Sequence, residues 1–159
     1  AGSGLEEVTL KFNPAPSFFG TTTTVAGLRD IKLGIDNVTN NVSINGNFGN
    51  GTTANVSLTD STLTNLTIEG NKVTTINLDL VSEFTGGVNR IATLNIPTLS
   101  SSATGRTLNI TGDAGLAGTN INDPNSSTRV ALNLNTSNPD AVTTVNAKEN
   151  TGGVKLFFT

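Results

Sequence analysis

The carboxylates are the side chains of this sequence best suited to acid–base chemistry. The chain has 159 residues with 12 Asp and Glu, and it contains no His, Cys, Met, Trp or Tyr. This composition excludes histidine-based catalysis, Ser-His-Asp triads, cysteine nucleophiles, disulfides and thiolate zinc sites. A glycosidase needs two carboxylates that face each other across the sugar. However, such sites usually carry aromatic platforms, and the chain is short for a β-helix enzyme, so we predict a non-catalytic protein.

The binding of a hard cation is the second chemistry that this sequence allows. Calcium takes several oxygen ligands, which carboxylates, amides and carbonyl groups supply. The region 112–125 contains a small group of such residues, and the candidate calcium ligands are Asp113, Asn120, Asp123 and Asn125. Asp and Asn are also common turn residues, and we favour that interpretation of these positions. No other cofactor is expected.

Strands must position these residues, because apolar and polar side chains alternate along most of the chain. Strict alternation over four to seven residues is typical of a half-buried strand, and no window shows the apolar stripe of a helix. We therefore predict an all-β fold with less than about a tenth helix, against a usual third. The predicted strands cover residues 8–12, 31–36, 41–44, 54–58, 64–69, 74–80, 92–96, 108–111, 130–134, 142–145 and 154–158.

The polar positions of the strands carry Asn and Thr rather than Lys and Glu, and the sequence contains 27 Thr and 22 Asn. From residue 42 to residue 76 the strand starts fall about 10–12 residues apart. In a parallel β-solenoid this interval is half a rung, and the Asn and Thr positions stack between rungs. In an antiparallel sandwich or jelly roll the same interval is one strand and its turn, and the uneven spacing after residue 80 favours that fold. Low charge, Asn placement and the absence of helix favour the solenoid, which we prefer by a small margin.

Several stretches resemble the repeat units of bacterial surface-layer proteins and large secreted adhesins. The closest stretch is 141–154, AVTTVNAKENTGGV, and 66–78 and 107–113 share its texture. The resemblance covers about residues 40–159. It implies a β-helix fold and a structural coat role, often with bound calcium. The sequence lacks the Gly-Gly-x-Gly-x-Asp calcium repeat, so the resemblance does not extend to a known calcium motif.

Both ends of the chain are apolar and aromatic. We predict that residues 1–20 form an extended N-terminal segment that serves as an assembly arm, and that residues 21–159 form a single all-β domain. Lys11 and Lys155 mark the terminal strands as sheet edges, whereas strands 54–58, 64–69 and 74–80 lack Lys and Pro and should be central. The residues predicted to mediate assembly, with residues 5–20 docking on a neighbouring copy, are Val8, Leu10, Phe12, Phe18, Phe19, Leu156, Phe157 and Phe158.

Charge and hydropathy restrict the partners. The net charge of −3 argues against nucleic acid, and no apolar run is long enough for a membrane-spanning helix. The first residue is Ala1, which we interpret as a sign of processing or of a fragment. We expect a secreted or cell-surface structural protein that self-assembles into a coat, adhesin or filament, with copies of itself and a cell-surface glycan as candidate partners. The alternatives are a virion protein, such as a tail fibre or head decoration protein, and a carbohydrate-binding module.

Overall fold

The computed structural model describes residues 7–11, 21–38, 42–96, 105–118, 130–134 and 142–158. These residues form strands joined by turns and contain no helix, so nothing in them could cross a membrane as a helix. The strands are β1 (Glu7–Lys11), β2 (Thr21–Val25), β3 (Lys32–Asp36), β4 (Val42–Asn47), β5 (Thr53–Thr59), β6 (Thr62–Glu69), β7 (Thr75–Val81), β8 (Val88–Ile96), β9 (Arg106–Gly112), β10 (Gly115–Ala117), β11 (Val130–Leu134), β12 (Val142–Asn146) and β13 (Leu156–Phe158).

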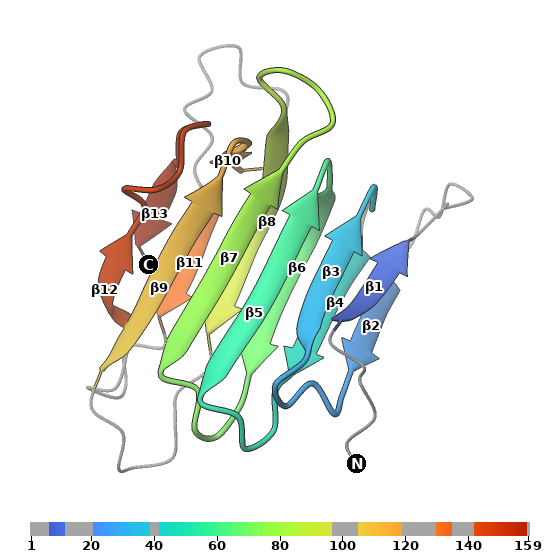
Figure 1. The fold of residues 1–159 in the computed structure, drawn as a ribbon, viewed down its shortest axis with the longest axis vertical. Coiled ribbons are helices and arrows are strands. Elements are labelled where there is room, and N and C mark those ends of the chain that lie inside the picture. The colour runs from blue at the N-terminus through green and yellow to red at the C-terminus, as the bar shows by residue number, and fades with distance from the viewer. Residues whose placement is uncertain are drawn as a thin grey trace.

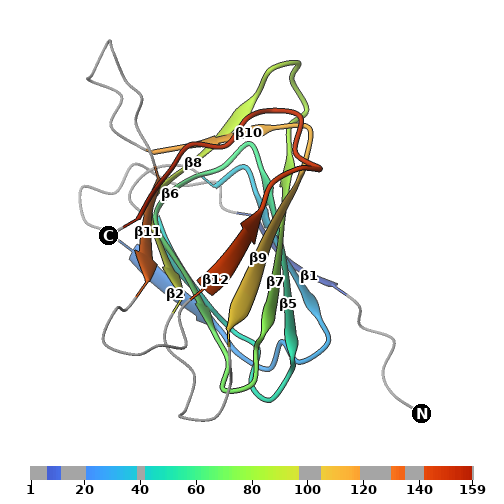
Figure 2. The same cartoon turned by 90° about the vertical axis from the view of Figure 1, so that its left-hand side faces the viewer.

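The strands form two parallel sheets that face each other (Figures 1 and 2). Sheet A has the order β1-β3-β5-β7-β9-β12, and sheet B has the order β13-β11-β8-β6-β4-β2, with β10 also paired to β8. Every pairing is parallel, and successive strands alternate between the sheets except β10 and β11, which both belong to sheet B, so the chain winds as a β-solenoid. The preference for a solenoid over an antiparallel sandwich is therefore confirmed.

The length of one rung explains the uneven strand spacing. Asn55 and Asn77 lie 22 residues apart and occupy equivalent positions on neighbouring strands. The next step on sheet B, from Thr67 to Asn95, takes 28 residues. Four of the six additional residues lie in the loop at 82–87, which replaces the two-residue turn that joins β5 to β6, and the other two extend the start of β8, because Thr62 pairs with Arg90. A loop can lengthen outside the stack without changing strand register, which is why the irregular spacing did not indicate a sandwich.

The core is a set of apolar columns between the sheets. On sheet A, Leu33, Val56, Leu78 and Ile110 follow one another in register, and each is at most 1% exposed. Sheet B contributes similar columns from β4, β6 and β8. Fully burying each such side chain stabilises a fold by about 1.5–3 kcal/mol. The outward positions of the same strands are polar, as the alternation predicts.

The corner that leads from sheet B to sheet A is apolar. Leu28 and Phe48 occupy equivalent places in successive rungs, the next rung has Gly70 at that place with Val73 packed beside it, and the three apolar side chains are buried. Gly46 makes room for Leu28 and Phe48, since a Cβ atom there would lie 3.0 Å from Leu33 Cδ2 and 3.3 Å from Phe48 Cε2. The corner therefore combines one large aromatic side chain with a matching glycine.

The sequence did not predict two of the strands, β2 and β10. The TTTTV sequence of β2 has no apolar–polar alternation, and β10 is only three residues long. The other eleven strands all appear near their predicted positions. Residues 7–11 of the segment interpreted as an arm form β1, which pairs with β3 and belongs to sheet A.

Candidate functional site

The structure describes one of the four candidate calcium ligands. Asp113 lies in the exposed turn between β9 and β10. Asn120, Asp123 and Asn125 fall outside the described residues. Within the described residues, no group of three or more acidic, His or Cys side chains gathers around a common point. The calcium site therefore stays a prediction.

The predicted assembly residues lie at the two ends of the solenoid. Val8 and Leu10 of β1 and Leu156 of β13 are half-buried and pack against the core of their own chain. Phe157 and Phe158 belong to β13 by their backbone, and Phe12, Phe18 and Phe19 fall outside the described residues. Assembly through these side chains therefore stays a prediction. Part of the surface of Val8, Leu10 and Leu156 is already buried against the core of the same chain.

The terminal strands also present backbone groups at the ends of the sheets. β1 and β2 lie at one end of the stack, and β12 and β13 lie at the other end (Figure 1). No described strand pairs with the outer side of any of the four. The central strands β5, β6 and β7 carry no Lys or Pro, and Lys11 belongs to an edge strand, as the sequence predicts.

The direction of the free N–H groups follows from the hydrogen bonds inside sheet A. The N–H group of Thr107 donates to the carbonyl oxygen of Thr74, and that of Thr75 donates to Thr52. Outward-facing residues of this sheet therefore direct their N–H groups toward the N-terminal end of the stack. Thr9 occupies the same outward register, because it pairs with Gly34. Its N–H group thus points away from β3, at the open edge of β1.

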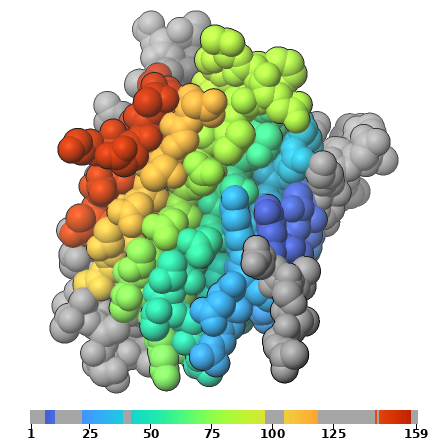
Figure 3. All heavy atoms as spheres, in the orientation of Figure 1, coloured from blue at the N-terminus to red at the C-terminus, as the bar shows by residue number. Residues whose placement is uncertain are grey.

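The outer face of sheet A carries a ladder of asparagine side chains. Asn77 Nδ2 donates to Asn55 Oδ1, and Asn109 Nδ2 donates to Asn77 Oδ1, each at 2.9 Å. The neighbouring column contains a hydroxyl–carboxylate pair, in which Thr111 Oγ1 donates to Asp79 Oδ1 at 3.1 Å. These strands lie side by side as bands across the face in Figure 3. A shallow polar groove of about 340 Å³ runs along this face.

A second, buried polar column lines the corner that leads from sheet A to sheet B. Ser61 Oγ accepts the N–H group of Val38 at 3.1 Å, and Asn89 Oδ1 accepts the N–H group of Ser61 at 2.9 Å. Asn89 Nδ2 donates to the carbonyl oxygen of Val81. In the last rung, Asn150 Nδ2 lies within hydrogen-bond distance of three backbone carbonyl oxygens between β9 and β10. The column satisfies backbone groups that the turns leave unpaired, so its role is structural.

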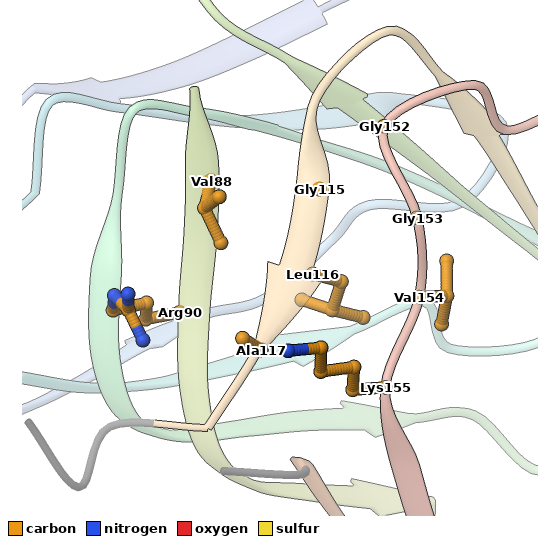
Figure 4. A pocket seen from close by; sticks show the side chains of 9 residues that line it. All are labelled: Val88, Arg90, Gly115, Leu116, Ala117, Gly152, Gly153, Val154 and Lys155. Atoms are coloured by element: carbon orange, nitrogen blue, oxygen red, sulfur yellow. The ribbon is translucent and has the colours of Figure 1, made fainter. Parts of the chain in front are cut away.

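A surface hollow of about 320 Å³ lies beside this corner, over three adjacent strand segments (Figure 4). β8 contributes Val88 and Arg90, β10 contributes its three residues, and the segment 152–155 contributes the far side. The segments are parallel, with Ala117 paired to Arg90 and a bridge between Leu116 and Val154. Ala117 therefore lies between two cationic residues, Arg90 and Lys155.

The charges of the hollow are of one sign. Arg90 and Lys155 line it, and none of its described lining residues is acidic. Arg90 NH1 donates to the carbonyl oxygen of Gly118 at 3.0 Å, which fixes the orientation of the guanidinium group. Neither cation forms an ion pair with a described residue, whereas Arg29 contacts Asp30 at 3.5 Å on the exposed surface. The hollow is chemically suited to an anionic group.

Sequence reasoning missed the buried corner and the hollow. Ser61 and Asn150 lie outside the long strands and Asn89 lies near the start of β8, where polar residues are common, and only the stacking of rungs reveals their common role. Arg90 and Lys155 are far apart in the sequence and meet because β10, which was not predicted, lies between them. One sequence signal could have found the hollow. Glycine-containing stretches stand at 112–115 and 152–153, next to two of the segments that line it.

No protein-family model matches the chain, and comparison with curated proteins and with solved structures found no significant similarity. The class of protein therefore rests on the fold itself, which is a parallel β-solenoid.

Proposed function

We propose that this protein is a non-catalytic structural protein that associates end to end outside the cell, as a subunit of a coat, adhesin or filament. The observation that carries the proposal is the pair of open sheet edges at opposite ends of one parallel stack. β1 presents its free edge toward the N-terminal end, and β12 presents its free edge toward the other end. Strand edges of this kind attract further strands.

The contact implied by these edges joins two different surfaces. β12 of one copy would accept β1 of the next, in the way that β9 accepts β12 within the chain. A contact between unlike surfaces does not close on itself unless its rotation forms a ring, so repeated stacking produces an open filament. Backbone hydrogen bonds would supply affinity, and the side chains at the junction would supply specificity.

The outer surface between the ends supports the same proposal. Sheet A presents neutral amides and hydroxyls along its central rungs, and the net charge of the whole chain is only −3. Copies of the protein therefore repel each other weakly. The absence of His, Cys, Tyr and Trp from the sequence supports the non-catalytic part of the proposal.

The substitution Thr9→Pro tests the junction. Proline removes the N–H group of Thr9, which points away from β3 and has no ladder partner in sheet A, and edge strands tolerate proline. The matched control is Thr9→Ala, which removes the side chain and keeps the N–H group. Sedimentation velocity over a concentration series, with electron microscopy of the same samples, measures assembly.

We expect the unchanged protein and Thr9→Ala to assemble, and Thr9→Pro to require about two- to tenfold higher concentration, since one hydrogen bond contributes about 0.5–1.5 kcal/mol. Circular dichroism should show the same β-sheet content in all three proteins. An unchanged protein that stays monomeric at millimolar concentration contradicts the proposal. If Thr9→Pro and Thr9→Ala assemble equally well, the edge of β1 does not take part in the contact between copies.

A further inference from the structure

We propose that the hollow at β8, β10 and residues 152–155 binds an acidic polysaccharide through an oxyanion group, a carboxylate or a sulfate, of one sugar residue. The proposal goes beyond end-to-end association and does not depend on it, because the hollow involves neither β1 nor β12.

The first argument is the position of the two cations. Arg90 pairs with Ala117, and Lys155 flanks Ala117 on the other side through the bridge between Leu116 and Val154. The backbones of the outer two segments are thus about 9–10 Å apart, which is twice the spacing of neighbouring strands. Figure 4 shows the side chain of Lys155 extending across toward Ala117, so its ammonium group can reach an anionic group above Ala117, while the side chain of Arg90 extends from β8 to the side away from Ala117 and adds its charge from there.

The second argument is preorganisation. One N–H group of Arg90 is held by the carbonyl oxygen of Gly118, so the planar guanidinium group keeps further donors in a fixed direction. A planar fork of donors matches the geometry of a carboxylate or a sulfate, and charge-assisted hydrogen bonds are roughly twice as strong as neutral ones. Lys155 adds a mobile point charge from an exposed position.

The third argument is the size and lining of the hollow. A volume of 320 Å³ corresponds to about ten water molecules at roughly 30 Å³ each, so it far exceeds a bare oxyanion. Gly115, Gly152 and Gly153 provide a floor of backbone, and Val88 and Val154 provide apolar walls. The occupant that fits is a charged group carried on a larger neutral body, as in a uronic acid or a sulfated sugar.

The binding test uses polygalacturonate and dextran sulfate as acidic probes, with neutral dextran as the control polymer. Isothermal titration at low salt and at concentrations below assembly should show binding to the acidic polymers and none to neutral dextran. Inorganic sulfate is titrated separately and as a competitor. Sulfate that binds as tightly as the polymers would show a site for a free anion and overturn the polysaccharide assignment.

Three variants locate the site. Arg90→Gln and Lys155→Gln each remove one charge, and Ala117→Leu fills the hollow while keeping both charges. We expect each to weaken binding by roughly tenfold or more. The matched control is Lys72→Gln, which removes an exposed cation from a turn at the apolar corner, and it should change affinity less than twofold.

Two results would overturn the assignment. Equal weakening by Lys72→Gln and Arg90→Gln would indicate nonspecific attraction to surface charge. Unchanged binding by Ala117→Leu would place the ligand outside the hollow. If Ala117→Leu does not fold, Lys155→Gln decides the question, because its side chain is exposed and forms no bond within the described residues.

Discussion

Replacing Asn89 by leucine is predicted to destabilise the solenoid strongly, although the two side chains are similar in size. Asn89 is 0% exposed, and it satisfies the backbone N–H group of Ser61 and the backbone carbonyl group of Val81 at 2.9 and 3.1 Å. Leucine leaves the N–H group of Ser61 without this partner, whereas the carbonyl oxygen of Val81 still accepts the N–H group of Asp60 at 3.3 Å. An unsatisfied buried group costs about 1–3 kcal/mol, so we expect a loss of about 1–3 kcal/mol.

The matched control for this prediction is Asn77→Leu on the outer ladder. Asn77 also takes part in two side-chain hydrogen bonds, with Asn55 and Asn109, but it lies half-buried on the face of sheet A. Water can replace these bonds, so the expected loss is below about 1 kcal/mol. The two variants remove the same number of hydrogen bonds and differ in burial, which isolates the effect of the corner.

Urea and thermal unfolding followed by circular dichroism measure both variants. For a chain of this size 1 kcal/mol lowers the melting temperature by about 2–4 °C, so Asn89→Leu should lower it by roughly 2–12 °C. The dependence of the free energy on urea should stay constant, because the fold is unchanged. Equal losses for the two variants, or a loss below about 1 kcal/mol for Asn89→Leu, would refute the structural role of the corner. If Asn89→Leu does not fold, Ser61→Ala, which removes a buried hydroxyl group of the same column, should still cost about 1–3 kcal/mol.

Two further predictions concern the turns. Gly112→Ala should cost more than about 2 kcal/mol in thermal unfolding, because its φ is 97° and the new Cβ atom would collide with the carbonyl oxygen of Leu80; Gly49→Ala, with a φ of 57° and open space around it, should cost only about 1 kcal/mol, and equal costs would contradict the steric argument. If the region 112–125 binds calcium, the melting temperature should rise in calcium and fall in chelator, and Asp113→Asn should reduce that difference; identical melts in calcium and chelator would exclude the site.

Local pattern was enough to predict the strands and the solenoid, because both depend on alternation. Most of the eleven predicted strands carry apolar residues at every second position over part of their length, and the stacked columns of Asn55, Asn77 and Asn109 follow from the placement of these residues between apolar neighbours. The strand β2 was missed because its four consecutive threonines conceal which side faces the core. The threonines of β2 favour a strand, but the segment lacks the apolar–polar alternation on which the prediction relied.

The candidate hollow could not be predicted, because it depends on which residues the rungs bring together. The step from β6 to β8 spans 28 residues and the step from β7 to β9 spans 32, so positions in these rungs cannot be aligned by counting. The three-residue strand β10 lies in such an enlarged rung and is too short to show a period. Without β10 there is no reason to place Arg90 near Lys155.

Alternation alone also leaves the register of the rungs undetermined. A slip of two residues keeps every apolar side chain inside and every polar one outside, because the side-chain period is two. A corner breaks this degeneracy in the central rungs, because Asn89 meets the N–H group of Ser61 of the preceding rung only in the observed register. A slipped rung would leave buried polar groups unpaired at that corner.

At the N-terminal end, charge performs the same task. Glu7 pairs with Lys32 in the backbone register, so residues of opposite charge stand beside each other at the start of the β1–β3 pairing. A slip of two residues would move Glu7 from Lys32 to Gly34 and separate the two residues. In an end-to-end junction that continues the internal register, Glu7 would instead stand beside the neutral Asn146 of the preceding copy, because Asn146 occupies the same column through Asn109 and Asn77. The junction then lacks this pairing of opposite charges, so its register must come from backbone groups and from the residues near the chain ends, which is why a backbone substitution in β1 is the sharper test of assembly.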